Sequence, residues 1–132
     1  MKTELKEEWK TYYNPRFNYS IKYPSSWLDQ PPAPNNDGKA LYKDKENEIL
    51  IYGTYEPSIF STQDIEVNRH IVVLDNGAVA TGMRFYNESR KVEYLVFVTK
   101  EDVQFVFSAT VTREFYQKNA KVLEKVAKSL EF

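Results

Sequence analysis

The segment Phe17–Trp27, FNYSIKYPSSW, begins the folded part of this chain. Its apolar side chains alternate with polar ones and occupy Phe17, Tyr19, Ile21 and Tyr23. A period of two is typical of a strand that buries one face. Pro24 cannot donate a ladder hydrogen bond, so it ends the strand, and we expect Trp27 to fold over the core. The segment is therefore predicted to hold the fold together rather than to bind a ligand.

Further strands are predicted on both sides of a proline-rich loop that runs from Leu28 to Gly38. A short strand is expected over Ala40 to Lys43 and a stronger one over Glu48 to Tyr55, because β-branched and aromatic residues are frequent there. Ser61 is positioned to cap a short helix over Thr62 to Asn68.

The second half of the chain has the pattern of a meander that ends in a helix. Asp75-Asn76-Gly77 favours a hairpin turn between HIVVL and AVATGMRFY. The next two strands, KVEYLVFVT and VQFVFSATV, are apolar on both faces, which indicates a sheet covered on both sides. Thr112 then caps a helix, whose apolar stripe consists of Phe115, Val122, Leu123, Val126 and Leu130.

These elements predict an α+β fold, an α/β/α sandwich whose central sheet is mainly antiparallel and whose C-terminal helix packs on that sheet. The chain has 132 residues, which suits one domain. Residues 1–10 are mostly charged and are expected to form a flexible lead-in, with Trp9 as the exception. Residues 11–132 are expected to form the single domain.

Composition excludes several classes of protein. The net charge is -1, whereas nucleic-acid binding depends on a surplus of Lys and Arg. The chain has no cysteine, which excludes disulfides and thiolate metal sites. No apolar run approaches the roughly 20 residues of a membrane helix, so no membrane insertion by this chain is expected. A chain that starts after a removed signal peptide or an upstream lipid anchor would have the same appearance.

The opening segment resembles the start of PsbP-like domains, an aromatic and aliphatic alternation followed by Tyr-Pro-x-x-Trp. The close resembles the same group, whose final helix carries a Ser-Leu-x-Phe tail, here Ser129, Leu130 and Phe132. These domains share an α/β/α sandwich with Mog-type Ran-binding factors and with many bacterial lipoproteins. The bacterial lipoproteins resemble this chain most, because their strand-turn-strand after the Pro-Trp segment is similar to NNDGKALYKDKENEILIYG. The resemblance implies a non-catalytic module that docks on larger assemblies, and it supplies no shared active site.

A search for catalytic groups gives little. His70 is the only histidine and has no partner nearby in the sequence, so a structural or exposed role is expected. Asp44, Glu46 and Glu48 have the alternate spacing of calcium ligands but lack the glycine and distal glutamate of a calcium loop. A charged hairpin turn is the expectation there. No catalytic residue, cofactor site or metal site is predicted.

Tyrosines are numerous enough that some must reach the surface, where Tyr is a favourable contact residue for proteins. The candidate partner-binding residues are Tyr42, Tyr52, Tyr55, Pro32 and Pro34. Ordinary packing at the rim of the core is the alternative for these tyrosines.

The leading hypothesis is a non-catalytic, extracytoplasmic module of the lipoprotein type, associated with the cell envelope, that binds a protein partner or assists an assembly. The alternatives are a cytosolic adaptor of the Mog type and a small hydrolase, which would need His70 in a polar pocket with two carboxylates. A monomer or weak dimer is expected.

Overall fold

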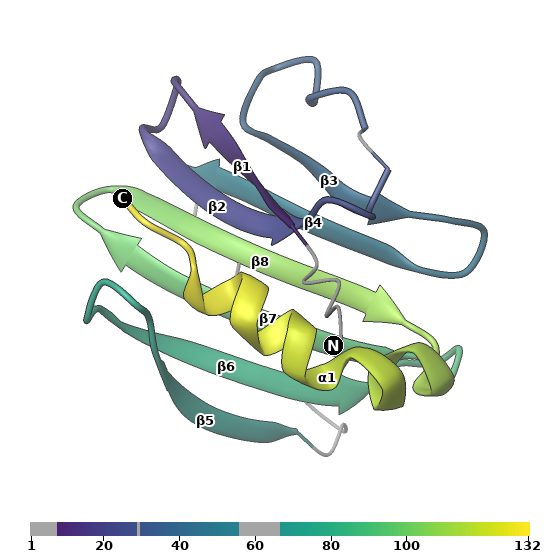
Figure 1. Ribbon diagram of the computed structural model, residues 1–132. Helices are drawn as coiled ribbons and strands as arrows, with labels where there is room; N and C mark the ends of the chain where they lie inside the picture. The colour runs from purple at the N-terminus through teal and green to yellow at the C-terminus, as the bar shows by residue number, and fades with distance from the viewer. Residues whose placement is uncertain (1–7, 29, 56–66) are drawn as a thin grey trace, which may run out of the picture.

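The computed structural model describes residues 8–28, 30–55 and 67–132. Their backbone forms one helix and eight strands, shown in Figure 1. The elements are β1 Trp9–Asn14, β2 Tyr19–Pro24, β3 Gly38–Lys43, β4 Glu48–Thr54, β5 Asn68–Val73, β6 Val79–Tyr86, β7 Val92–Lys100, β8 Val103–Val111 and α1 Arg113–Lys128. Strands β1 and β2 pair as a ribbon, and the other six form one antiparallel sheet in the order β3-β4-β8-β7-β6-β5. The predicted α+β fold with a C-terminal helix on the sheet is confirmed.

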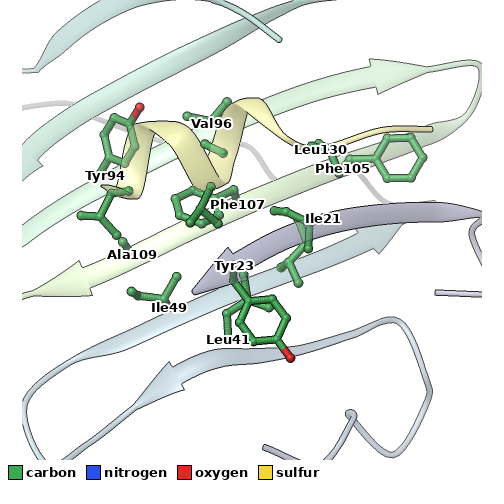
Figure 2. Close-up of a cluster of buried hydrophobic side chains, with 14 of the residues drawn as sticks. Ile21, Tyr23, Leu41, Ile49, Tyr94, Val96, Phe105, Phe107, Ala109 and Leu130 are labelled. Carbon is green, nitrogen blue, oxygen red and sulfur yellow. The ribbon is translucent and has the colours of Figure 1, made fainter. Parts of the chain in front are cut away.

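The core lies between the sheet and α1, which crosses the sheet in Figure 1. Alternate residues of the central strands point into it, and Figure 2 shows their side chains meeting between the helix and the sheet. Each is almost fully buried: Ile49, Ile51, Tyr94, Val96, Phe105, Phe107, Ala109 and Val111. Burial of one large apolar side chain stabilises a fold by roughly 1.5–3 kcal/mol, so this layer is the main source of stability.

Helix α1 starts and ends with local signals that the sequence carries. The hydroxyl of Thr112 accepts a hydrogen bond from the Phe115 N–H at 3.1 Å, as predicted for an N-cap. Lys125 and Lys128 lie in the last turn, where positive charge is favoured by the helix dipole. The buried side is the predicted apolar stripe, which includes Leu123 and faces β2, β7 and β8.

The β1–β2 ribbon closes the same core from beside the helix. Tyr19, Ile21 and Tyr23 are all at most 3% exposed, which confirms the strand predicted from the alternation over these residues. Phe17 is also buried, but it precedes the strand, in a turn where Asn18 has a φ of 54°. Trp27 is 7% exposed and its ring contacts that of Tyr42, with centroids 5.7 Å apart. It covers the core as expected.

The C-terminal tail ties this ribbon to the helix. Ser20 and Glu131 exchange two backbone hydrogen bonds of 2.8 and 2.9 Å. The Ser129 hydroxyl accepts a hydrogen bond from the Lys22 N–H at 2.8 Å. Phe132 stacks on a core ring, so the Ser-Leu-x-Phe ending is a structural clasp.

Two expectations need adjustment. Strand β1 begins at Trp9, so residues 9 and 10 belong to the ribbon and not to the lead-in that we expected over residues 1–10. No apolar alternation marks β1, because its residues are partly buried or exposed except the polar Asn14, which is fully buried. The helix predicted over Thr62 to Asn68 lies outside the described residues except at its end, where Asn68 begins β5.

The sheet face opposite α1 is also withdrawn from solvent at its centre. Met83, Leu95 and Val106 alternate with the core-facing residues of their strands, and each is at most 4% exposed. The two-sided apolar pattern of β7 and β8 thus corresponds to burial on both faces. At the β5 edge this face is open, since Ile71 is 74% exposed.

Candidate functional site

An apolar pocket of about 320 Å³ opens beside strand β3. The proline-rich loop forms one wall through Pro31 and Ala33. Strands β3 and β4 form the other wall, mainly through Ala40, Leu50 and Tyr52. Leu50 and Tyr52 alternate with the core-facing residues of β4, so the pocket lies on the sheet face opposite α1.

Backbone contacts hold the loop against the sheet. The Ala33 N–H donates to the Gly38 carbonyl at 2.9 Å, and Pro32 bridges to Lys39. Gly38 allows this close approach, because a Cβ atom there would lie 1.8 Å from the Ile51 carbonyl oxygen. The loop therefore covers the outer edge of β3 at this point and leaves the pocket between itself and the sheet.

The base of the loop is fixed from inside the molecule. The Asp37 carbonyl accepts hydrogen bonds from the Tyr19 hydroxyl at 2.8 Å and from the Gly53 N–H at 3.0 Å. Tyr19 belongs to the opening segment, which thus also positions the pocket. Burial raises the pKa of Tyr19, so its hydroxyl remains a donor to this carbonyl.

The pocket is lined mainly by small and apolar side chains. Its lining includes two charged residues, Asp37 and Lys39. The Lys39 ammonium lies near the rings of Tyr12 and Tyr23, 5.4 and 5.7 Å from their centroids. The lining thus combines small and apolar side chains with the backbone of an edge strand, which is the composition expected of a site for a partner's side chain.

The structure distributes the predicted partner-binding residues over three places. Tyr52 lines the pocket, and Pro32 and Pro34 are exposed on its loop wall. Tyr55 is 57% exposed and packs on the ring of Phe17, beside the end of β4.

Tyr42 lies apart from the other predicted residues. Its ring contacts Trp27 and Phe115 on the helix side of the sheet, and its hydroxyl donates to Asp44 at 2.8 Å. The register of β3 shifts between Ala40 and Tyr42, so Tyr42 pairs with the core-facing Ile49 and lies on the opposite face from Ala40 and Tyr52.

The sequence analysis missed the apolar residues of this pocket. No sequence motif includes Ala33, Ala40 or Leu50. A small or aliphatic residue on a strand predicts burial in the core and does not indicate a pocket. The alternation of β4 does contain the signal in part, because Leu50 and Tyr52 fall on the face away from Ile49 and Ile51.

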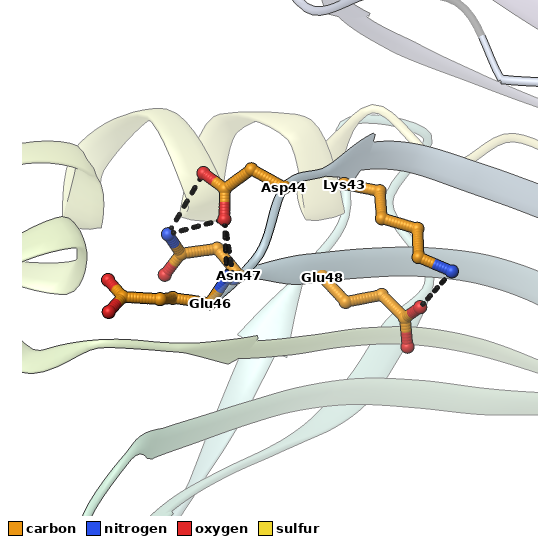
Figure 3. A network of polar contacts seen from close by, with 5 residues as sticks. All are labelled: Lys43, Asp44, Glu46, Asn47 and Glu48. Carbon is orange, nitrogen blue, oxygen red and sulfur yellow. Dashed lines mark hydrogen bonds and ion pairs between the residues drawn. The ribbon is translucent and has the colours of Figure 1, made fainter.

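The acidic cluster is a hairpin turn, as Figure 3 shows. The Asp44 carboxylate accepts hydrogen bonds from the Glu46 and Asn47 N–H groups at 2.8 and 2.7 Å. These bonds, led by the one from Glu46, lower the pKa of Asp44 to about 2. Glu48 pairs with Lys43 at 3.6 Å. Among the described residues no group of three His, Asp or Glu side chains is placed to hold a metal ion.

His70 lies at the far edge of the sheet, on β5. It is exposed, and its ring is nearly parallel to that of Tyr94, with centroids 6.3 Å apart and planes at 15°. The described residues of the surrounding pocket include one carboxylate, Glu124, where the hydrolase alternative requires two.

No helix among the described residues is long and apolar enough to span a membrane.

The likeness to known proteins is one of three-dimensional structure. No protein-family model matches the sequence, and no curated protein sequence matches it. The fold is similar to the solution structure of cyanobacterial PsbP (CyanoP) from Synechocystis sp. PCC 6803, with a TM-score of 0.62 and 10% identity. The match covers 93% of this chain and 91% of that one. The PsbP-like fold implied by the two ends of the sequence is thereby confirmed.

Proposed function

We propose that this protein is a non-catalytic binding or assembly module that docks a protein partner in the pocket beside β3. The observation that carries the proposal is the pocket itself. It presents Leu50 and Tyr52 on a sheet face, next to an edge strand. Of the two charged residues in its lining, Asp37 accepts a hydrogen bond from the Asn35 amide and Lys39 lies near two tyrosine rings. The occupant would be an apolar side chain of the partner, held between the proline-rich loop and the sheet.

Preorganisation supports this proposal. The loop is fixed by the Ala33–Gly38 and Asp37–Gly53 backbone hydrogen bonds, so little ordering would be needed on binding. Tyr52 offers a rigid ring with a polar end, which is the combination found at the energetic centres of protein interfaces. A volume of about 320 Å³ is at the lower end for small-molecule sites and is sufficient for one or two side chains.

The resemblance of the sequence to PsbP-like bacterial lipoproteins supports a proposal for the cellular location. We propose an extracytoplasmic module associated with the cell envelope, and a cytosolic adaptor of the Mog type is the alternative. Protease accessibility of the chain in spheroplasts of the source cells distinguishes the two. Digestion from outside supports the envelope assignment, whereas protection until lysis supports the adaptor.

Site-specific photo-crosslinking tests the pocket. We would place a photoreactive phenylalanine analogue at Tyr52, which lines the pocket, and at Lys118, which is exposed on α1, as the matched control. The expected result is a discrete protein adduct from position 52 that is absent from position 118. Ala33→Trp would fill the pocket from the loop without altering the sheet, and it should abolish that adduct. An adduct that survives Ala33→Trp, or that forms equally at Lys118, would show that the pocket is not the docking site.

A further inference from the structure

A second pocket, of about 290 Å³, lies between α1 and the β5 edge of the sheet. Its polar lining comes from β5, β6, β7 and α1, and consists of Asn68, His70, Arg84, Tyr94, Tyr116, Lys121 and Glu124. It is on the helix side of the sheet, whereas the pocket beside β3 is on the other side and at the other edge. The two sites can therefore be tested separately.

Two small residues leave room for this pocket. Gly82 lies opposite His70 in the β5–β6 register, and a Cβ atom on Gly82 would come within 2.5 Å of the imidazole Nε2. The imidazole thus lies over the glycine and reaches the ring of Tyr94. On the helix, Ala120 follows Tyr116 by four residues and lies on the same side, so the space between helix and sheet stays open.

Tyr94 supplies a donor to the pocket. The residue is 5% exposed, and no hydrogen bond of its hydroxyl is present among the described residues. Because no buried side-chain polar atom there lacks a partner, this hydroxyl must be accessible from the pocket. Figure 2 shows this hydroxyl directed away from the core cluster, and Tyr94 lines the pocket. Burial raises the pKa of Tyr94, so the hydroxyl keeps its proton. It therefore offers a hydrogen bond to an acceptor that replaces water in the pocket.

The charges around this donor favour a negative ligand. The Arg84 guanidinium donates to the Tyr116 hydroxyl at 3.2 Å and lies 5.7 Å from that ring, which holds it in place. Lys121 adds a second cation. Glu124 also lines the pocket, but its carboxylate is paired with Lys128 at 2.8 Å. The pocket thus has more donors and positive charge than acceptors.

We propose that this pocket binds a small organic oxyanion, a molecule that carries a phosphate or carboxylate group. Arg84 forms the charge-assisted contact and the Tyr94 hydroxyl donates a second hydrogen bond. Asn68, His70 and Lys121 surround the rest of the ligand. The proposal does not depend on the docking of a protein partner beside β3.

Titration of the isotopically labelled chain, followed by amide NMR signals, tests the proposal. The probes are inorganic phosphate and succinate, at an ionic strength held constant with chloride. We expect saturable shifts at Asn68 and His70 with at least one probe, and the tighter probe identifies the oxyanion. Arg84→Gln should raise the dissociation constant by about tenfold or more, and Tyr94→Phe by severalfold, as expected for the loss of charged and neutral hydrogen bonds.

Two further variants fix the interpretation. Arg16→Gln removes the same charge from an arginine that bonds the Asn35 carbonyl near the other edge of the sheet, and it should leave the affinity unchanged. Glu124→Gln removes the one carboxylate among the described lining residues and should tighten binding. Shifts that do not saturate with either probe would overturn the proposal. So would equal affinities of the wild-type chain, Arg84→Gln and Tyr94→Phe, with folding verified by circular dichroism.

Discussion

At the scale of single residues, Asp44 shows how one carboxylate specifies a turn. It accepts hydrogen bonds from the Glu46 and Asn47 N–H groups and from the Tyr42 hydroxyl, and so closes the β3–β4 connection. The turn also reaches α1, because the Asn47 side-chain oxygen accepts a hydrogen bond from the Thr112 N–H at 2.8 Å.

Asp44→Ala is predicted to lower the free energy of unfolding by about 1 kcal/mol near neutral pH. The expected loss is small because solvent weakens the hydrogen bonds of an exposed carboxylate. The pKa of Asp44 is lowered on folding, to about 2. Its contribution is therefore complete above the unfolded-state pKa of about 4 and is lost as the pH falls through about 2. Urea denaturation of both proteins across this range measures the difference.

The control for this prediction is Glu46→Ala, which removes the same charge from the same turn. No hydrogen bond of the Glu46 carboxylate is present among the described residues, so this variant should remain within about 0.5 kcal/mol of the wild-type chain. A loss equal to that of Asp44→Ala would mean that net charge matters here and the turn bonds do not.

At the scale of elements, the clasp between β2 and the C-terminal tail depends on Ser129. Its hydroxyl accepts a hydrogen bond from the Lys22 N–H and donates to the Val126 carbonyl at 2.6 Å. Ser129→Ala should lower the free energy of unfolding by about 1–2 kcal/mol, because it leaves the strand N–H without this acceptor. Chemical denaturation measures this, with Ser89→Ala in an exposed turn as the control. Equal stability of the two variants would contradict a clasp.

Strand β5 is an open edge of the sheet. Ile71 is 74% exposed, and among the described residues no strand pairs with β5 on the side away from β6. Exposed apolar edges promote association of sheets, and lysine suppresses it. Ile71→Lys should slow concentration-dependent association, measured by light scattering, with little change in stability. Leu28→Lys is the matched control, because Leu28 is 79% exposed but lies in a loop. An equal effect of the two variants would show that general hydrophobicity, and not the edge, drives association.

The predictability of elements followed the strength of their periodicity. The alternation from Tyr19 to Tyr23, the Asn76-Gly77 turn and the stripe of α1 each reflect a local geometry, so the sequence predicts them directly. Phe17 continues the alternation in sequence but lies in the turn before β2. The local pattern does not predict strand β1, because the burial of its residues depends on pairing with β2. The pockets are less predictable still. Leu50 meets Ala33 only after the loop folds back, and Tyr94 lines a cavity only because Gly82 and Ala120 are small.

At the scale of the whole molecule, two sheets share one interior. Ile21 of the ribbon is fully buried in the same cluster as Phe107 of the main sheet, and Figure 2 shows both beside the helix. Because the β1–β2 ribbon buries its apolar face only against this cluster, it has no stable form of its own. The ribbon and the sheet should therefore unfold together.

Ile21→Ala tests this cooperativity. The substitution should lower the free energy of unfolding by about 2–4 kcal/mol, and Ile21→Val by about 1 kcal/mol, as expected for cavities of different size. Trp9 and Trp27, the two tryptophans of the chain, both lie at the ribbon end, so fluorescence reports the ribbon and far-ultraviolet circular dichroism reports the sheet. The two signals should give one midpoint in each variant. A fluorescence transition that precedes the loss of circular dichroism would show that the ribbon separates first and that the shared core is not one cooperative unit.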